Sequence, residues 1–325
     1  MRRTTKGWLI AATVLVVFGS LLFAAAMTVN QWDFMKLSTV AYETNTYELS
    51  ESFHDIEINT DTADISFVLS GDDKCSVICR ESEQEKHMVE AENGVLTIRT
   101  CIDKNVFDSI GIVTESPEIT IYLPKREYAS LILKGSTGDI EISRDFLFRN
   151  MDVSTSTGDV ENKASSLDTM KIRTNTGDIH VADVFAGELD LTVSTGEVTG
   201  EAISCSGDTT ITVDTGKTQL TDVTCQNLIS NGNTGDLFLQ SVIAQGSFSI
   251  ERSTGDVNFE RCDAADIFVK TSTGYVEGSL LSEKLFITET STGRVVHPQS
   301  GAGGNCTILT RTGDIKIRVE TYHTN

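Results

Sequence analysis

The chain has 325 residues and a formal net charge of −21 at pH 7. A surface this acidic repels phosphate backbones, so nucleic acid is excluded as a partner. The length could hold two domains, but a repeat of fixed period can extend one continuous core over the same number of residues.

The N-terminal segment, residues 1–30, predicts a membrane anchor. Arg2, Arg3 and Lys6 precede an uncharged, mostly apolar run at residues 8–29. At about 1.5 Å per residue this run is long enough to cross about 30 Å of hydrocarbon. The basic residues are expected to stay in the cytoplasm, which makes the chain a single-pass membrane protein with its C-terminal domain outside the cell.

A cleaved signal peptide is the alternative interpretation of the same segment. Ala24 and Ala26 form an A-x-A match, although the apolar run exceeds the core of about 7 to 15 residues that signal peptides use. In either case residues 31–46 are predicted to be a juxtamembrane linker.

Residues 47–124 are predicted to form a β cap that covers the open end of a repeat array. Residues 56–67 carry an outlying copy of the repeat described next, with Ala63 in the place of its glycine. The register then breaks, and Asn93 and Gly94 predict a hairpin between two short strands.

The rest of the chain is a repeat marked by Thr-Gly pairs, each of which follows a short apolar strand. Successive glycines are 19 or 20 residues apart, and threonine precedes all ten of them. We take these glycines as structural corners, because glycine tolerates a positive φ. They are Gly138, Gly158, Gly177, Gly196, Gly216, Gly235, Gly255, Gly274, Gly293 and Gly313.

Apolar residues recur at fixed positions around each glycine. Leu131 and Leu133 stand seven and five positions before Gly138, and Ile140 stands two positions after it. A spacing of two indicates a strand with one face inward. The alternation of inward and outward residues shifts by one position between the threonine, which we place inside, and Ile140. The backbone must therefore turn there. Small or apolar residues nine positions after the glycine, such as Leu147, predict a further inward strand or corner.

One such turn cannot bury its apolar row alone, but turns stacked about 4.8 Å apart bury each row against the next. The sequence therefore predicts an all-β fold, a single-chain parallel β-solenoid (β-helix) over residues 125–320. A right-handed sense is expected because crossovers between parallel strands are nearly always right-handed. Residues 321–325 are predicted to be a polar tail.

Several motifs together resemble one known bacterial family. They are Trp32-Asp33-Phe34, the stretch NTDTADI at 59–65, the stretch ITIYLP at 119–124 and the ladder of Ser-Thr-Gly-Asp turns. The chain resembles the "putative adhesin" family with a β-strand repeat domain of unknown function, which includes LiaG-like proteins of Gram-positive envelopes. This resemblance implies the solenoid and a place at the cell surface, and it supplies no catalytic residues.

An acidic residue follows most corner glycines and forms a column along the stack. A cation such as Ca²⁺ would relieve repulsion within it. We favour the structural interpretation, in which each carboxylate bonds backbone amides at the corner, because Lys217 and Arg294 stand in the same column. The acidic members are Asp139, Asp159, Asp178, Glu197, Asp236, Asp256 and Asp314.

Cys205 and Cys225 share one column in consecutive turns, within the spacing of a disulfide. We expect free buried thiols instead, because the column otherwise holds mostly leucine or alanine and free cysteine packs as a small apolar residue. The sequence has no C-x-x-C pair, and its five histidines fall in different repeat phases. No metal site, cofactor or catalytic residue is predicted.

Tyr275 and Arg294 replace acidic residues at the corners of consecutive turns. An aromatic ring beside a cation is a possible beginning of a groove for a sugar or a peptide. The sequence therefore offers these two residues as a binding patch.

The combined features predict a non-enzymatic surface module for adhesin-like binding or envelope sensing. Its expected partners are the membrane, through the N-terminal helix, and a cell-wall glycan or a protein. One alternative is a polysaccharide-acting enzyme, since β-helices also host such sites, but the uniform turns leave no inserted loops to wall a cleft. The other alternative is a scaffold that self-assembles at the cell surface.

Overall fold

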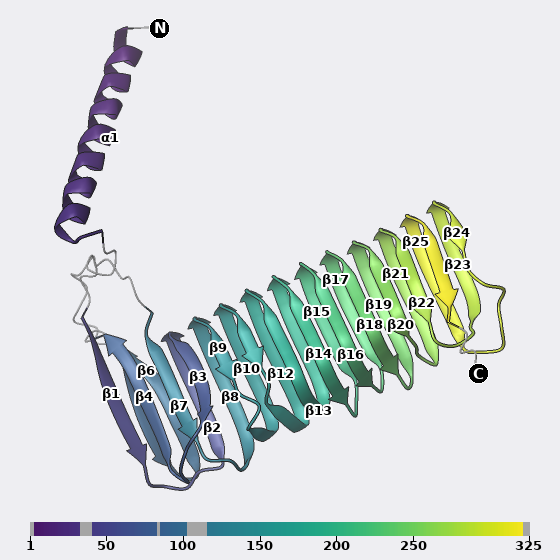
Figure 1. Cartoon of the computed structure of the whole chain (residues 1–325), viewed down its shortest axis with the longest axis horizontal. Helices are drawn as coiled ribbons and strands as arrows, with labels where there is room; N and C mark the ends of the chain where they lie inside the picture. The colour runs from purple at the N-terminus through teal and green to yellow at the C-terminus, as the bar shows by residue number, and fades with distance from the viewer. Residues whose placement is uncertain (1–2, 33–40, 83–84, 103–115, 321–325) are drawn as a thin grey trace.

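The computed structural model describes residues 3–32, 41–82, 85–102 and 116–320. Helix α1 (Arg3–Val29) precedes a long array of strands, β1 to β26 (Figure 1). Its segment Lys6–Val29 is long and apolar enough to cross a membrane. This agrees with the predicted membrane anchor or signal peptide. The tail at 321–325 and residues 33–40, half of the predicted linker, lie outside the described residues, and residues 42–46 of that linker belong to the first strand.

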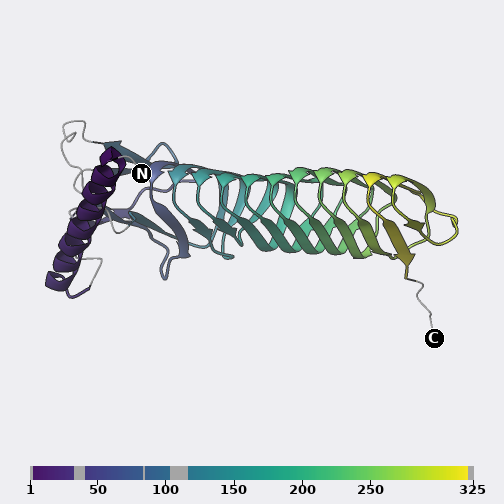
Figure 2. The same ribbon diagram turned by 90° about the horizontal axis from the view of Figure 1, so that it is seen from above.

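The strands form two ladders around one core, and Figure 2 shows the successive coils along the rod. In spatial order, ladder one contains β5 (Glu85–Glu92), β6 (Val95–Ile102), β2 (Asp55–Thr62), β8 (Glu127–Thr137), β10 (Leu147–Thr157), β12 (Ser165–Thr176), β13 (Ile179–Thr195), β15 (Thr209–Thr215), β17 (Leu228–Thr234), β19 (Ser247–Thr254), β21 (Asp266–Thr273), β25 (Asn305–Thr312) and β23 (Leu285–Thr292).

Ladder two contains the strands that follow the corners. In spatial order these are β1 (Tyr42–Leu49), β4 (Cys75–Ser82), β7 (Glu118–Leu123), β3 (Asp64–Leu69), β9 (Ile140–Ile142), β11 (Val160–Asn162), the first part of β13, β14 (Val198–Cys205), β16 (Thr218–Cys225), β18 (Leu237–Ala244), β20 (Val257–Cys262), β22 (Val276–Leu280), β26 (Ile315–Val319) and β24 (Val295–Val296).

Equivalent residues of successive coils pair in register, as Ile211 does with Leu191 and Ser230. The fold is a β-solenoid of about 10 turns of ~20 residues, which confirms the predicted class. The right-handed sense stays a prediction. Inward positions seven and five residues before each glycine and two after it form the core, with Leu131, Leu133 and Ile140 all at most 2% exposed.

The corner glycines fulfil two requirements at once. Nine of the ten have φ between +133° and +157°, a region that side chains with a Cβ rarely adopt. The coils also approach closely here, since a Cβ on Gly216 would lie 1.8 Å from the carbonyl oxygen of Gly196.

A second corner falls six residues after the glycine, and the sequence did not reveal it. Its residues are not glycine but adopt the left-handed region, with φ between 51° and 57°. In the five coils that contain such a residue, the two corners together bend the chain around the core. These residues are Asp183, Ala202, Asp222, Ser241 and Arg261.

The threonine before each glycine was predicted to point inward, and this was wrong. Thr157 and Thr215 are exposed, as are all their equivalents. The last inward position is two residues earlier, where Thr174 is buried and its hydroxyl donates to the carbonyl of Gly158 over 3.1 Å. The strand therefore leaves the packed face before the residue pair that precedes the glycine, and the corner begins two residues sooner than the alternation of inward and outward residues suggested.

The spatial order of coils departs from the chain order at both ends. Strands β2 and β3, the outlying repeat copy, lie between β6/β7 and the first regular coil, β8/β9. At the other end β25/β26 lie between β21/β22 and β23/β24. The predicted cap thus contains two coils of the solenoid, closed outside by the antiparallel strands β1, β4 and β5.

Candidate functional site

The acidic corner column is a set of hydrogen bonds between coils. The carboxylate of Asp159 accepts the backbone N–H of Asp178 over 2.8 Å, and that of Asp178 accepts the N–H of Glu197 over 2.7 Å. These amides face the neighbouring coil where the ladder is interrupted by the turn. The column has the structural role favoured from the sequence, since its carboxylates hold corner amides.

The predicted patch of Tyr275 and Arg294 is not a pair of neighbours. Val276 and Val295 both pair with Ile315, so the coil that carries Asp314 lies between the two residues. The backbone N–H of Arg294 donates to Asp314 over 2.8 Å, whereas that of Tyr275 donates to Asp256 over 2.7 Å. Two coil steps, about 9.6 Å, separate the two backbones. The expected contact fails because the coil order was taken from the chain order.

A different surface forms a groove of ≈ 570 Å³ on ladder two. It crosses β16, β18, β20, β22 and β26 at the positions three and five residues after each corner, and it includes Glu320, seven residues after the last one. Phe238 is 36% exposed there, and the ammonium of Lys217 lies 4.9 Å from the centre of its ring. The outward lining is otherwise polar: Gln219, Thr221, Gln240, Asn258, Glu260, Glu277, Ser279, Lys316, Arg318 and Glu320.

Neighbouring strands fix the polar side chains at the far end of this groove. The hydroxyl of Ser279 donates to Glu320 over 2.7 Å, and Arg261 forms an ion pair with Glu320 at 3.4 Å. Glu277 pairs in register with Lys316, so opposite charges are adjacent. Sequence reasoning followed the inward columns and missed this groove. Comparison of the outward columns would have found an exposed phenylalanine among amides.

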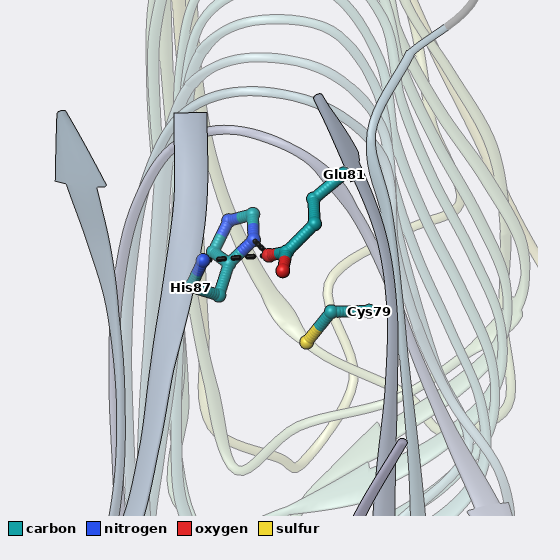
Figure 3. Close-up of side chains that lie close together, drawn as sticks. All are labelled: Cys79, Glu81 and His87. Atoms are coloured by element: carbon teal, nitrogen blue, oxygen red, sulfur yellow. Dashed lines mark hydrogen bonds and ion pairs between the residues drawn. The ribbon is translucent and has the colours of Figure 1, made fainter. Parts of the chain in front are cut away.

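A second cluster lies inside the N-terminal cap, where β4 and β5 face each other (Figure 3). Cys79 and Glu81 lie on the inward face of β4, and His87 lies on β5. All three are buried, and their ligand atoms lie within 4.8 Å of one another. The sequence did not bring these three residues together, because Cys79 and His87 are eight positions apart on two different strands and match no known metal-binding motif.

Hydrogen bonds hold this cluster firmly. One carboxylate oxygen of Glu81 accepts both the backbone N–H of His87, at 2.6 Å, and its Nδ1, at 2.8 Å. The other accepts the side-chain amide of Asn45 at 2.7 Å. The hydroxyl of Tyr47 donates to the carbonyl of His87 over 3.1 Å. Nε2 of His87 is buried and has no hydrogen-bond partner among the described residues.

The cysteines are free thiols, as expected for Cys205 and Cys225. Burial raises the pKa of Cys225 to about 12, and burial together with the charge of Glu81 raises the pKa of Cys79 to about 12. Such thiols are protonated at neutral pH and pack as apolar groups. Cys101 is the exposed exception.

A family model described as Toastrack DUF4097 matches residues 53–318. The chain belongs to this family. The Toastrack match begins in the cap and ends in the last strand, so it includes every coil, the buried cluster and nearly all of the groove. It confirms the resemblance found from the sequence. Among curated proteins, none matches the chain.

Solved structures with similarity to this Toastrack chain include three bacterial proteins. A "putative adhesin" from Parabacteroides distasonis has 11% identity and a TM-score of 0.45, with 87% of this chain and 98% of that chain covered. A "putative adhesin" from Bacteroides fragilis has 14% identity and a TM-score of 0.39, covering 86% and 97%. A "putative cell adhesion protein" from Clostridium sporogenes has 10% identity and a TM-score of 0.23, covering 87% and 100%.

Proposed function

We propose that this chain is a non-catalytic binding module of the cell surface that holds an extended carbohydrate chain in the groove of ladder two. The N-terminal helix anchors it in the membrane, and the solenoid lies outside the cell. The observation that carries the proposal is the lining of the groove, in which an exposed aromatic ring stands among amides and paired charges.

Each kind of side chain in the groove suits a sugar polymer. The amides of Gln219, Gln240 and Asn258 can donate to and accept from hydroxyl groups. Phe238 offers a flat apolar face, and aromatic rings contribute disproportionately to binding energy when a ligand covers them. The groove runs across five strands of successive coils, so it presents these groups repeatedly along the rod. A linear chain of similar units fits such a surface.

The test uses the full-length protein in lipid nanodiscs and an array of cell-wall glycans, with affinity measured by biolayer interferometry. Phe238→Ala is expected to weaken binding of the retained glycan about tenfold, the equivalent of about 1.4 kcal/mol. Phe185→Ala is the matched control, since Phe185 is 39% exposed on β13, outside the groove. Equal affinity in the wild type and Phe238→Ala would remove the groove from the proposal.

The same glycan, recovered after incubation, separates binding from catalysis. A binding module returns it at its original length, as mass spectrometry would show. Shortened products that disappear in Glu277→Gln or Glu260→Gln would instead establish a polysaccharide-acting enzyme, the alternative that β-helices also permit.

Self-assembly is the second candidate, and the distal edge of the rod favours it. Ile287 of β23 is 55% exposed and Val296 of β24 is 50% exposed, on strands whose outer side faces no described strand. Exposed apolar edges are sites of strand pairing between molecules. Sedimentation of nanodisc complexes would show end-to-end dimers that Ile287→Lys abolishes. A monomeric wild type at all concentrations would exclude this candidate.

A further inference from the structure

We propose that Cys79, Glu81 and His87 supply three of the four ligands of a Zn²⁺ site, with a water molecule as the fourth, and that the ion links the two ladders in the N-terminal cap. The three donors converge from two facing strands into one buried space (Figure 3). This inference is independent of the groove and of the proposed function.

The spacing of the donors suits this ion. Zn²⁺ binds thiolate sulfur at about 2.3 Å and imidazole nitrogen or carboxylate oxygen at about 2.0 to 2.2 Å. In the tetrahedral geometry that zinc prefers, donors at these distances lie about 3.4 to 3.7 Å apart. The donor atoms here lie within 4.8 Å of one another. Side-chain rotations on binding are expected to bring them to the tetrahedral separation.

The chemistry of the donors selects the ion. A thiolate and an imidazole favour zinc over calcium or magnesium, which prefer sets of oxygen ligands. One thiolate and one carboxylate neutralise a divalent cation, so the occupied site carries no net charge in its buried position. On binding, the single ring proton of His87 resides on the nitrogen that does not contact the ion, and the thiol proton of Cys79 leaves to solvent.

The surroundings orient two of the donors before the ion arrives. Asn45 holds the second carboxylate oxygen of Glu81 at 2.7 Å, and Tyr47 holds the backbone of His87 at 3.1 Å. Outer-shell hydrogen bonds of this kind fix ligand geometry in metal sites. Strand β5 lies at the edge of ladder one and pairs only with β6 among the described strands. A local opening of this edge gives the ion a route in.

The consequence of binding is a connection that the hydrogen-bond ladders do not make. Strand β4 pairs with β1 and β7 in ladder two, whereas β5 pairs with β6 in ladder one. Among the described residues, no β-sheet pairing joins β4 to β5. An ion held by both would link the two ladders at the end of the core nearest the N-terminus. Zn²⁺ is therefore expected to raise the unfolding temperature of the cap.

The test uses Co²⁺, which replaces Zn²⁺ and gives a near-ultraviolet charge-transfer band when a thiolate binds it. All proteins are full-length, in detergent micelles, and carry Cys101→Ser to remove the exposed thiol. One equivalent of Co²⁺ is expected to produce the band, and Zn²⁺ to abolish it. Cys79→Ala is expected to lose the band and the rise in unfolding temperature with Zn²⁺.

Cys75→Ala is the matched control, because Cys75 is buried on the same face of the same strand but outside the cluster. It is expected to keep both the band and the stabilisation. His87→Gln should bind Co²⁺ more weakly with an altered visible spectrum, provided that circular dichroism shows the native fold. The absence of a thiolate band in the parent protein, or its retention in Cys79→Ala, would overturn the proposal.

Discussion

Asp139 and Asp159 occupy the same corner of adjacent coils, and the carboxylate of Asp139 accepts the backbone N–H of Asp159 over 2.8 Å. The same bond recurs one coil further, from Asp178 to Asp159. A carboxylate thus replaces the backbone acceptor that an uninterrupted ladder would supply. The acidity of this edge follows from the needs of the turn, since an ionised acceptor makes a stronger hydrogen bond than a neutral one.

Substitution of a corner carboxylate should weaken the rod locally. Asp159→Ala leaves the N–H of Asp178 without its acceptor, and we expect a loss of about 1 kcal/mol in the free energy of unfolding. Asp159→Asn keeps an acceptor oxygen and should lose less. Glu251→Ala, on an exposed strand position, is the control. Urea denaturation followed by circular dichroism measures all three, and equal values for Asp159→Ala and Glu251→Ala would contradict this role.

The corner glycines should not tolerate even one methyl group. Gly216→Ala places a Cβ 1.8 Å from the carbonyl of Gly196 at a φ of +141°. We expect a loss of about 3 kcal/mol or more, because strain and a steric clash act together. Gly71→Ala meets nothing within 4 Å and should change stability little. Thermal unfolding of both variants measures the difference in stability. A Gly216→Ala protein as stable as Gly71→Ala would contradict the prediction.

The order of the coils at the distal end predicts different losses in the free energy of unfolding for two substitutions. Ile308 is 1% exposed in an inner coil, whereas Phe286, an inward residue of the outermost coil, is only partly buried. Ile308→Ala should lose about 2 to 5 kcal/mol, as buried isoleucines do, and Phe286→Ala should lose less than the about 3 to 5 kcal/mol of a fully buried phenylalanine. If coils stacked in chain order, Ile308 would belong to the terminal coil. Chemical denaturation of the two variants therefore distinguishes the two orders.

The buried thiols make stability depend on pH in the alkaline range. Burial raises the pKa of Cys75, Cys225 and Cys306 from 9.0 to about 12. Unfolded thiols lose their protons first, so unfolding releases protons between pH 9 and pH 12. The stabilisation is complete below pH 9 and falls as the pH rises, by at most about 1.4 kcal/mol per thiol and pH unit.

Denaturation at pH 8 and pH 10 measures this effect, and Cys225→Ala should reduce the difference between the two. A thiol-specific label at pH 8 provides an independent check. It should modify Cys101 rapidly in the native protein and the six buried cysteines only after unfolding. Rapid native labelling of Cys225 would show that its column is open to solvent.

Periodic features of the sequence predicted the periodic part of the fold. The spacing of Leu131, Leu133 and Gly138 was enough to predict the coils, because inward residues at the same position of successive coils bury one another. The coil order was beyond this reasoning, since equivalent residues such as Val276 and Val295 present the same apolar row to Ile315. Coils stacked in chain order and coils stacked in the observed order satisfy the apolar pattern equally well. Connection geometry and side-chain fit, which the period does not encode, make the choice.

The sites were harder to predict than the fold for a related reason. Groove residues such as Phe238 and Asn258 point outward, where burial imposes no pattern. The interior also holds charged side chains that break its apolar pattern, among them Arg252, which is 5% exposed and whose guanidinium donates to Ser230 over 2.8 Å. Gly232 in the preceding coil leaves the space for it, since a Cβ there would lie 1.7 Å from the guanidinium. The pair becomes visible only once the two coils are stacked.

The placement of β26 between β22 and β24 determines how the rod responds to tension. A partner that pulls on the C-terminal strand must separate it from neighbours on both sides at once. Tension applied from the N-terminal side loads β1 instead, which pairs only with β4 among the described strands. Under load β1 is therefore the first strand to detach, and the distal coils keep their packing while the N-terminal segment lengthens.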